Sequence, residues 1–396
     1  MKILQQIKVV LPPLCRSGRK IFMAVLIGAA LGLPLAGMTA CTGGREEAMA
    51  GSDYGSFGSE MAIKLATQDP YRKAYSAGEK AAAEFIARQI KNLGYEYKEQ
   101  QFTSNGKSGR NIIVSLPGRG FYRPQTAATD IAGAPDKTLT VGDFKRRIIV
   151  GAHYDTKLGE ENKSEAPKFD GISDNASGVA VLLNVLRQIK GVTTGFDVDI
   201  VFFGASGDGF AGAKAYLASI GNEQRREIES VIVVDSIYGG DNLYANAGIN
   251  SAAPDNRHRL RTPLYDLLNI SVSNYTGLRL LDNQGGFKVK VQGLTNSVVY
   301  REFTFKESDH TPFDAAGLPV VYIESGNYKV KEVNNTLENR TQLFEPTGGA
   351  IRGTNYDDID TLKENLPEGM LELRINSTTF ILKTYIESGL YNAKMQ

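Results

Sequence analysis

Cysteine and histidine are scarce in this sequence, which limits the chemistry that the chain can perform. The 396 residues contain two cysteines, Cys15 and Cys41, and three histidines. Both cysteines lie in the N-terminal stretch, so the rest of the chain can form neither a disulfide framework, nor a cysteine nucleophile, nor a thiolate metal site. An excess of charge is absent as well: the net charge is +1 and the basic residues are scattered. We therefore expect no nucleic-acid partner.

The N-terminal stretch has the pattern of a secretory signal peptide. Basic residues precede an apolar run from Ile21 to Ala40, and the small residues near its end are typical of a cleavage site. Residues 38–41 (Met-Thr-Ala-Cys) resemble a bacterial lipoprotein cleavage site, which implies a lipid anchor at Cys41. A retained membrane helix is the alternative, but three glycines and a proline in the run make it a poor spanning segment. We therefore expect residues 1–41 to be a lipoprotein signal peptide, with the mature protein attached to a membrane of the bacterial cell envelope, at the outer membrane or on the periplasmic face.

The remaining chain divides by composition into a short tether and one large domain. Residues 42–59 are rich in Gly, Glu and Ser and show no periodicity, which indicates a flexible tether. Residues 60–396 are expected to form a single domain with an irregular insertion around 239–307. Within this domain, short apolar runs alternate with segments of helical periodicity, which predicts an α/β fold with a mostly parallel sheet. The expected strands are 95–102, 110–116, 148–150, 198–203, 230–234 and 320–324, and the expected helices are 76–93, 174–186, 209–220 and 366–388.

Five side chains that could bind a metal or orient a ligand lie at the ends of these predicted elements: His153, Asp155, Asp174, Asp235 and His310. Open α/β sheets place ligands at the carboxyl ends of their strands, and histidine nitrogen with carboxylate oxygen suits zinc. Asp155 could accept a hydrogen bond from His153 and orient the imidazole. Asp174 taken alone is more simply explained as a helix N-cap. The set together predicts a metal site.

Several short motifs together resemble the bacterial co-catalytic zinc aminopeptidases, metallopeptidase family twenty-eight. They are, in order, residues 151–155 (Gly-Ala-His-Tyr-Asp), 174–178 (Asp-Asn-Ala-Ser-Gly), 203–205 (Phe-Gly-Ala) with 212–216 (Gly-Ala-Lys-Ala-Tyr), Asp235, and 308–313 (Ser-Asp-His-Thr-Pro-Phe). The resemblance spans roughly residues 76–324 and the last helix. It implies a three-layer α/β sandwich of the zinc-exopeptidase type, a mixed central sheet, and hydrolysis of peptides at their amino termini.

The resemblance also implies how the ligands are shared. In the family, one zinc takes the residues matching His153 and Asp235, and the other takes a glutamate and the residue matching His310. The residue matching Asp174 bridges the two ions. This chain would therefore bind one or two zinc ions with peptide as substrate or ligand.

The sequence departs from the family where the catalytic glutamates are expected. The family carries two adjacent glutamates here, of which the first is the general base and the second a zinc ligand. Ser206 and Gly207 occupy these positions; neither accepts a proton near neutral pH, and glycine offers no ligand atom. Asp208 is the nearest carboxylate and could act instead if the loop is two residues shorter than in relatives. Glu302 and Glu307 are further candidates that no motif supports.

Three functions remain open from the sequence. The first is a zinc-dependent aminopeptidase with impaired catalysis, which the retained ligands favour. The second is an inactive pseudopeptidase that binds metal or peptide, which the Ser206-Gly207 replacement favours. The third is an enzyme similar to glutaminyl cyclases, although such enzymes also need a glutamate at the replaced position.

The replaced pair generates a direct prediction. The double variant Ser206→Glu with Gly207→Glu should create or raise peptidase activity, because it restores a general base and a ligand to an otherwise retained site; a general base contributes roughly 10²- to 10⁴-fold to a rate. Steady-state hydrolysis of aminoacyl chromogenic substrates measures it. No gain in a variant that binds two zinc ions would mean that the substrate pocket itself has diverged.

Overall fold

The structure is a computed structural model that describes residues 54–121, 145–157, 168–248, 306–326 and 348–394, with Phe344 and three short strands at 280–281, 287–289 and 298–300. The chain divides into two units, Met1–Glu47 and Ala48–Gln396. The first unit, with the expected signal peptide and Cys41, lies outside the described residues, as does Glu302. No helix in the described part of the chain is long and apolar enough to span a membrane.

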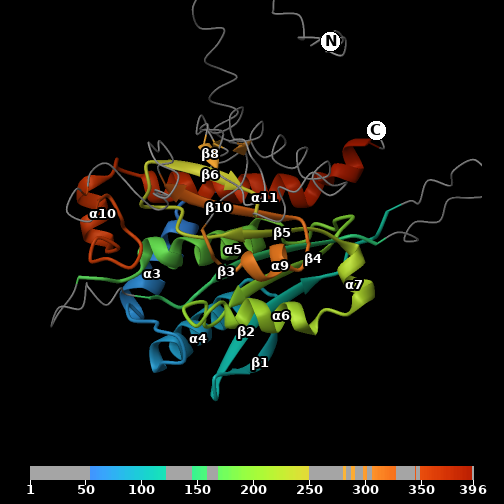
Figure 1. Cartoon of the computed structure of the whole chain (residues 1–396), viewed down its shortest axis with the longest axis horizontal. Helices are drawn as coiled ribbons and strands as arrows, with labels where there is room; N and C mark the ends of the chain where they lie inside the picture. Colours follow the sequence, from blue (N-terminus) through green and yellow to red (C-terminus); the bar gives the residue numbers. More distant parts are fainter. Residues whose placement is uncertain are drawn as a thin grey trace, which may run out of the picture. The chain divides into compact units, whose positions relative to one another are not determined.

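A mixed sheet forms the centre of the second unit (Figure 1). Among the described residues it has eight strands in the order β1-β2-β4-β3-β5-β10-β6-β7. The strands of this sheet are β1 (Lys98–Ser104), β2 (Lys107–Leu116), β3 (Arg147–His153), β4 (Asp197–Phe203), β5 (Ile228–Val234), β6 (Asn242–Asn246), β7 (Leu280–Leu281) and β10 (Val320–Gly326). The central strands β4, β3, β5 and β10 are parallel to one another, whereas β2 and β6 pair antiparallel with the central group. The carboxyl ends of the four central strands therefore meet at one edge.

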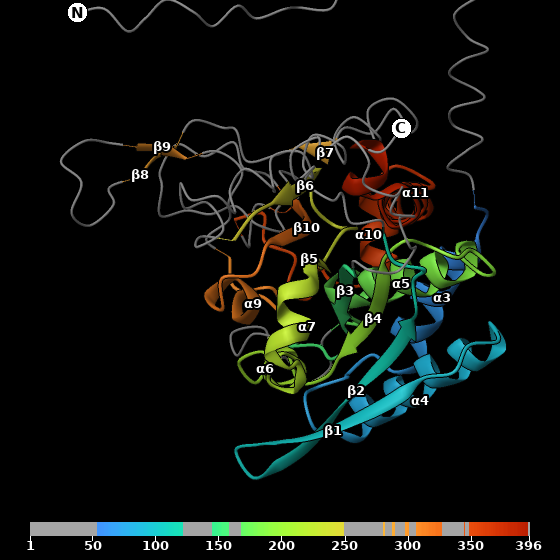
Figure 2. The same ribbon diagram turned by 90° about the vertical axis from the view of Figure 1, so that its right-hand side faces the viewer.

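Helices cover both faces of this sheet, which makes three layers (Figure 2). One face carries α3 (Phe57–Gln68), α4 (Ala77–Asn92), α5 (Ser177–Gln188) and α11 (Met370–Lys394), and the other carries α6 (Ala211–Ser219) and α9 (Thr311–Ala315). The other described elements are the turn η3 (Ile172–Ala176), helices α7 (Asn222–Glu227) and α10 (Ile359–Asn365), and the separate hairpin of β8 (Phe287–Val289) and β9 (Val298–Tyr300). The predicted α/β three-layer fold is confirmed.

The central strands are apolar throughout because both of their faces are buried. Side chains alternate across a strand, so Ile148 and Val150 pack toward α5, whereas Ile149 packs toward α6 and α9. Gly151 follows in the same strand, and a Cβ atom there would lie 2.2 Å from the ring of Phe203. Continuous apolar runs are what strands buried on both faces require.

Two features of the domain organisation differ from the sequence prediction. Helix α3 begins at Phe57, so residues 57–59 of the expected tether are helical. The expected irregular insertion at 239–307 contributes β6 and β7 to the main sheet, where β6 pairs with β10. These strands are short, and their partners are distant in sequence, so local periodicity gave little sign of them.

Arg72 fixes the two chain segments that carry the site residues. Its side chain is fully buried, and within the described residues its hydrogen bonds all go to backbone carbonyls. Its Nε lies 3.0 Å from the carbonyl oxygen of Tyr154, and its Nη atoms lie 2.9 Å from those of Asp170 and Gly171. The segment after β3 and the segment before η3 are thus tied to one guanidinium.

Replacing Arg72 should therefore destabilise the fold. Arg72→Met keeps much of the volume but leaves buried carbonyl oxygens without donors, so we expect the free energy of unfolding to fall by at least about 3 kcal/mol. Urea unfolding followed by circular dichroism measures the change, with Arg88→Met on the exposed face of α4 as the matched control. Equal stability of the two variants would contradict the role given to Arg72.

Candidate metal centre

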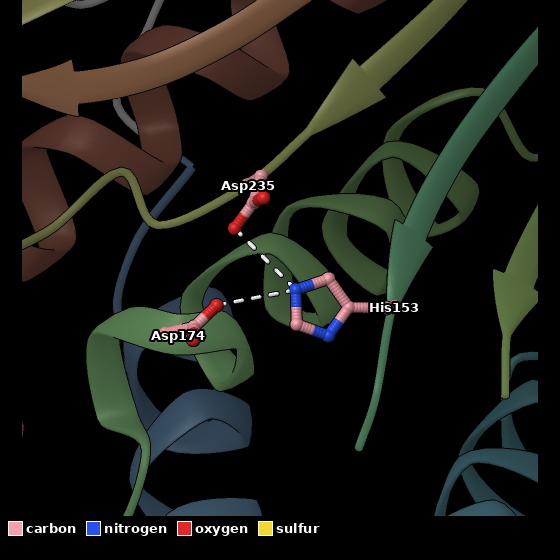
Figure 3. Close-up of side chains that lie close together, drawn as sticks. All are labelled: His153, Asp174 and Asp235. Carbon is pink, nitrogen blue, oxygen red and sulfur yellow. Dashed lines mark ion pairs between the residues drawn. The ribbon is translucent and has the colours of Figure 1, made fainter. Parts of the chain in front are cut away.

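His153 ends strand β3, and its ring lies between two carboxylates (Figure 3). Its Nε2 atom is 3.2 Å from Oδ1 of Asp174 and 3.4 Å from Oδ1 of Asp235. Its other ring nitrogen, Nδ1, is 2.9 Å from the backbone carbonyl oxygen of Asp155. A carbonyl acceptor at Nδ1 places the proton there and leaves Nε2 as the metal-binding nitrogen.

Asp155 does not orient His153 through its carboxylate as expected. The carboxylate oxygen Oδ1 is 3.7 Å from Nδ1 of His153; it accepts a hydrogen bond from the backbone N–H of Ser206 at 2.9 Å, and Oδ2 accepts one from Gly207 at 2.8 Å. The carboxylate of Asp155 therefore holds the loop in which Ser206 and Gly207 replace the two glutamates of the family. The backbone carbonyl of Asp155 positions the imidazole of His153.

Asp174 lies in the turn η3, and the explanation of this residue as an N-cap is wrong. Helix α5 begins at Ser177 after Ala176, without a side-chain cap. The turn is instead attached to the end of β5 by Asn175, whose Nδ2 donates to the carbonyl oxygen of Val234 at 2.9 Å and whose Oδ1 accepts from the N–H of Ser236 at 3.0 Å. This attachment places the Asp174 carboxylate beside Asp235, the residue that follows β5.

Gly178 is needed for the same attachment. A Cβ atom at this position would lie 2.3 Å from Oδ1 of Asn175 and 2.7 Å from the carbonyl oxygen of Val234. The motif at residues 174–178 is thus explained by close packing between the start of α5 and the end of β5.

His153, Asp174 and Asp235 fit a metal ion. One ligand atom from each lies within 4.8 Å of the others, and all three residues are buried. Nε2 of His153 has no hydrogen bond of good geometry, although buried polar atoms nearly always have a partner. Nitrogen and carboxylate ligands of this kind suit zinc. His153 and Asp174 line a cavity of about 520 Å³, so a ligand can reach the cluster.

Arg352 is the residue of the site that the sequence did not reveal. Its Nε atom is 3.0 Å from Oδ2 of Asp174, and its Nη1 atom is 2.9 Å from Oδ2 of Asp235. Burial would raise the pKa of both carboxyl groups, but the neighbouring positive charges and hydrogen-bond donors, foremost Arg352, together outweigh it. The pKa of Asp174 is held below the usual range, and that of Asp235 well below it. Both carboxylates are therefore ionised and able to bind a cation at neutral pH. No sequence signal marked Arg352, which stands in a polar segment without periodicity.

His310 does not join the cluster of three ligands. It is buried, and its ring packs against the ring of Tyr322 at 4.5 Å between centroids. Burial, together with Lys306 and Arg352, lowers its pKa to about 3, so the imidazole is neutral at pH 7. Its Nδ1 atom has no hydrogen-bond partner among the described residues. His310 thus keeps a free ligand atom at the edge of the site.

Asp208 points away from the cluster. Its carboxylate accepts hydrogen bonds from the hydroxyl groups of Tyr75 at 2.7 Å and Ser104 at 2.9 Å. It does not line the cavity, whereas Ser206 and Glu307 do. Among the described candidates for a replacement base, Glu307 is therefore the one that faces the cavity.

Asp309 generates a pH-dependent prediction. It is fully buried, and neither carboxylate oxygen has a hydrogen bond of good geometry in the described structure; burial is the main cause that raises its pKa from 3.8 to about 7. A carboxyl group whose pKa is raised by folding destabilises the folded state as it ionises, between about pH 4 and pH 7. Asp309→Asn should therefore raise the melting temperature at pH 8 and raise it less at pH 5. Calorimetry of the metal-free protein measures this; a larger gain at pH 5 would contradict the assignment.

Comparison with known proteins identifies the family of this chain. The family model described as Peptidase family M28 matches residues 137–373. The alkaline phosphatase isozyme conversion protein of Escherichia coli K12 is 23% identical over 333 residues, which cover 83% of this chain and 88% of that protein.

Solved structures share the fold. A zinc aminopeptidase from Bacillus subtilis superposes with a TM-score of 0.55 at 13% identity, covering 85% of this chain and 96% of that one. A glutaminyl cyclase from an Acidobacteriales bacterium superposes with a TM-score of 0.52 at 18% identity, covering 84% and 96%. The family match extends over more than half of the sequence and includes the whole three-residue cluster, so this chain belongs to peptidase family M28 and has a metallopeptidase fold.

Proposed function

We propose that this protein is a zinc-dependent peptide hydrolase of the aminopeptidase type, which removes residues from the amino termini of peptides. The observation that carries the proposal is the buried cluster of His153, Asp174 and Asp235 at the wall of an open cavity. Membership of the family and the fold shared with a zinc aminopeptidase support the reaction class. The attachment to the cell envelope through Cys41 is part of the proposal and is supported by the sequence pattern alone.

The residues have separate roles in this proposal. His153, Asp174 and Asp235 would hold the metal ion, which when bound would supply Lewis acidity for peptide hydrolysis. The backbone carbonyl of Asp155 fixes the tautomer of His153. Asp155 also holds the backbone of Ser206 and Gly207 with its carboxylate. Glu307 lies on the cavity wall and is the proposed proton acceptor in place of the missing glutamate.

An inactive pseudopeptidase is the second candidate, and one observation favours it. Ser206 and Gly207 place only a hydroxyl group and backbone atoms where the family resemblance expects a base and a ligand. Such a protein would bind metal and peptide without turnover. A cyclase acting on amino-terminal glutamine is a third candidate, supported by the shared fold with glutaminyl cyclases.

The proposal is tested by metal content and turnover measured together on the chain that begins after Cys41. We expect tightly bound zinc in the wild-type protein and hydrolysis of some members of a panel of aminoacyl chromogenic substrates. Asp174→Ala should remove the metal and the activity, because it takes away one of three ligands. Elemental analysis and a continuous absorbance assay measure the two effects.

Asp208→Asn is the matched control, since it changes an aspartate of the neighbouring loop whose carboxylate is bonded to Tyr75 and Ser104. It should keep both metal and activity. Unchanged metal in Asp174→Ala would contradict the assigned ligands. Bound zinc without turnover of any peptide would favour the pseudopeptidase, and release of pyroglutamyl product from glutamine substrates would favour the cyclase.

A further inference from the structure

The two oxygen atoms of Asp174, and likewise those of Asp235, face two different groups. The Oδ1 atoms face Nε2 of His153 at 3.2 and 3.4 Å. The hydroxyl group of Ser236 also lies 3.1 Å from Oδ1 of Asp174 and 2.7 Å from Oδ1 of Asp235. The Oδ2 atoms face Arg352 at 3.0 and 2.9 Å. The metal position and the guanidinium therefore lie on opposite sides of the same pair of carboxylates.

Among the described residues, the Oδ2 side has no complete set of ligands for another metal ion. Oδ2 of Asp235 also accepts hydrogen bonds from the hydroxyl groups of Ser308 at 2.7 Å and Tyr322 at 3.0 Å. Gly207 offers no side chain, and His310, whose ring packs against that of Tyr322, could add only a single nitrogen ligand. A second divalent ion would have to displace Arg352 and break these bonds.

The contacts of Arg352 oppose its displacement from the two carboxylates. Its guanidinium contacts two carboxylates at once, a planar geometry that arginine satisfies better than lysine. One divalent ion and one guanidinium would bring three positive charges to the two carboxylates of Asp174 and Asp235, so this set of groups would already carry one excess positive charge. Two divalent ions beside Arg352 would place like charges within a few ångströms of one another, which is strongly unfavourable in a site of low dielectric constant.

We infer that Arg352 is a permanent second cation of this site. Its guanidinium stays paired with the Oδ2 atoms of Asp174 and Asp235 and restricts the protein to one metal ion per chain. The inference rests on the metal site of the proposed function. The remaining N–H groups of Arg352, whose side chain is 25% exposed and lines the cavity, are available to an oxygen atom of a bound ligand. The chain would thus combine one metal with one guanidinium where its relatives are expected to use two metals.

The experiment is a zinc titration of the metal-free protein, with stoichiometry from native mass spectrometry and affinity from calorimetry. We expect one zinc ion per wild-type chain. Arg352→Gln should bind its first zinc at least about tenfold more tightly, because removing a neighbouring positive charge lowers the repulsion that the ion meets. Arg352→Lys should stay closer to the wild type than Arg352→Gln does, since it keeps the charge although not the planar contact with both carboxylates.

Arg147→Gln is the matched control. Arg147 also joins two aspartates, with Nη1 2.6 Å from Asp199 and Nη2 3.2 Å from Asp197, but it begins β3, at the opposite end of the strand from His153. This variant should bind one zinc with wild-type affinity. Circular dichroism of each variant establishes that it is folded, and the zinc stoichiometry of the wild-type chain keeps the test decisive if Arg352→Gln does not fold.

The outcomes separate the inference from the proposed function. Two zinc ions per wild-type chain, or weaker zinc binding by folded Arg352→Gln, would overturn the inference. No zinc on the wild-type protein would overturn both the inference and the metal site. One zinc with the expected effect at Arg352 but no peptide hydrolysis would support the inference and contradict only the proposed activity.

Discussion

The structure depends on the burial of two carboxylates, Asp174 and Asp235, side by side at the carboxyl edge of a parallel sheet. Removing two negative charges from water is costly unless cations and hydrogen bonds compensate them. Here Arg352 pairs with their Oδ2 atoms, and Nε2 of His153 faces their Oδ1 atoms. The hydroxyl group of Ser236 also contacts both Oδ1 atoms, and those of Ser308 and Tyr322 donate to Oδ2 of Asp235. The fold thus brings together the groups that compensate these two carboxylates, and the same carboxylates are the proposed metal ligands.

Much of the central fold could be predicted because its signals are local. The apolar runs of β3, β4, β5 and β10 are continuous since both faces of each strand are buried, and such runs are visible in sequence. The placement of His153 and Asp235 follows from the same logic, because parallel strands end at a common edge. The short strand β6 gave no comparable signal, since its position in the sheet depends on pairing with the distant β10.

The site was predicted less completely, because some of its contacts form only in three dimensions. Arg352 reaches Asp174 and Asp235 from a segment more than a hundred residues further along the chain, and nothing in its neighbourhood distinguished it from a solvated arginine. Asp208 was near the site in sequence, but its carboxylate turns to the β1–β2 hairpin. In the loop after β4, closeness in sequence to the site residues therefore did not predict closeness in space to the metal ligands.

The central claim is that one metal ion and one guanidinium share the two aspartates. The most direct measurement is an anomalous difference map at the zinc absorption edge, from crystals of the protein grown with excess zinc. The account predicts one peak beside Nε2 of His153 and the Oδ1 atoms of Asp174 and Asp235, with Arg352 still bonded to both Oδ2 atoms. Two peaks with Arg352 displaced from the carboxylates would contradict it.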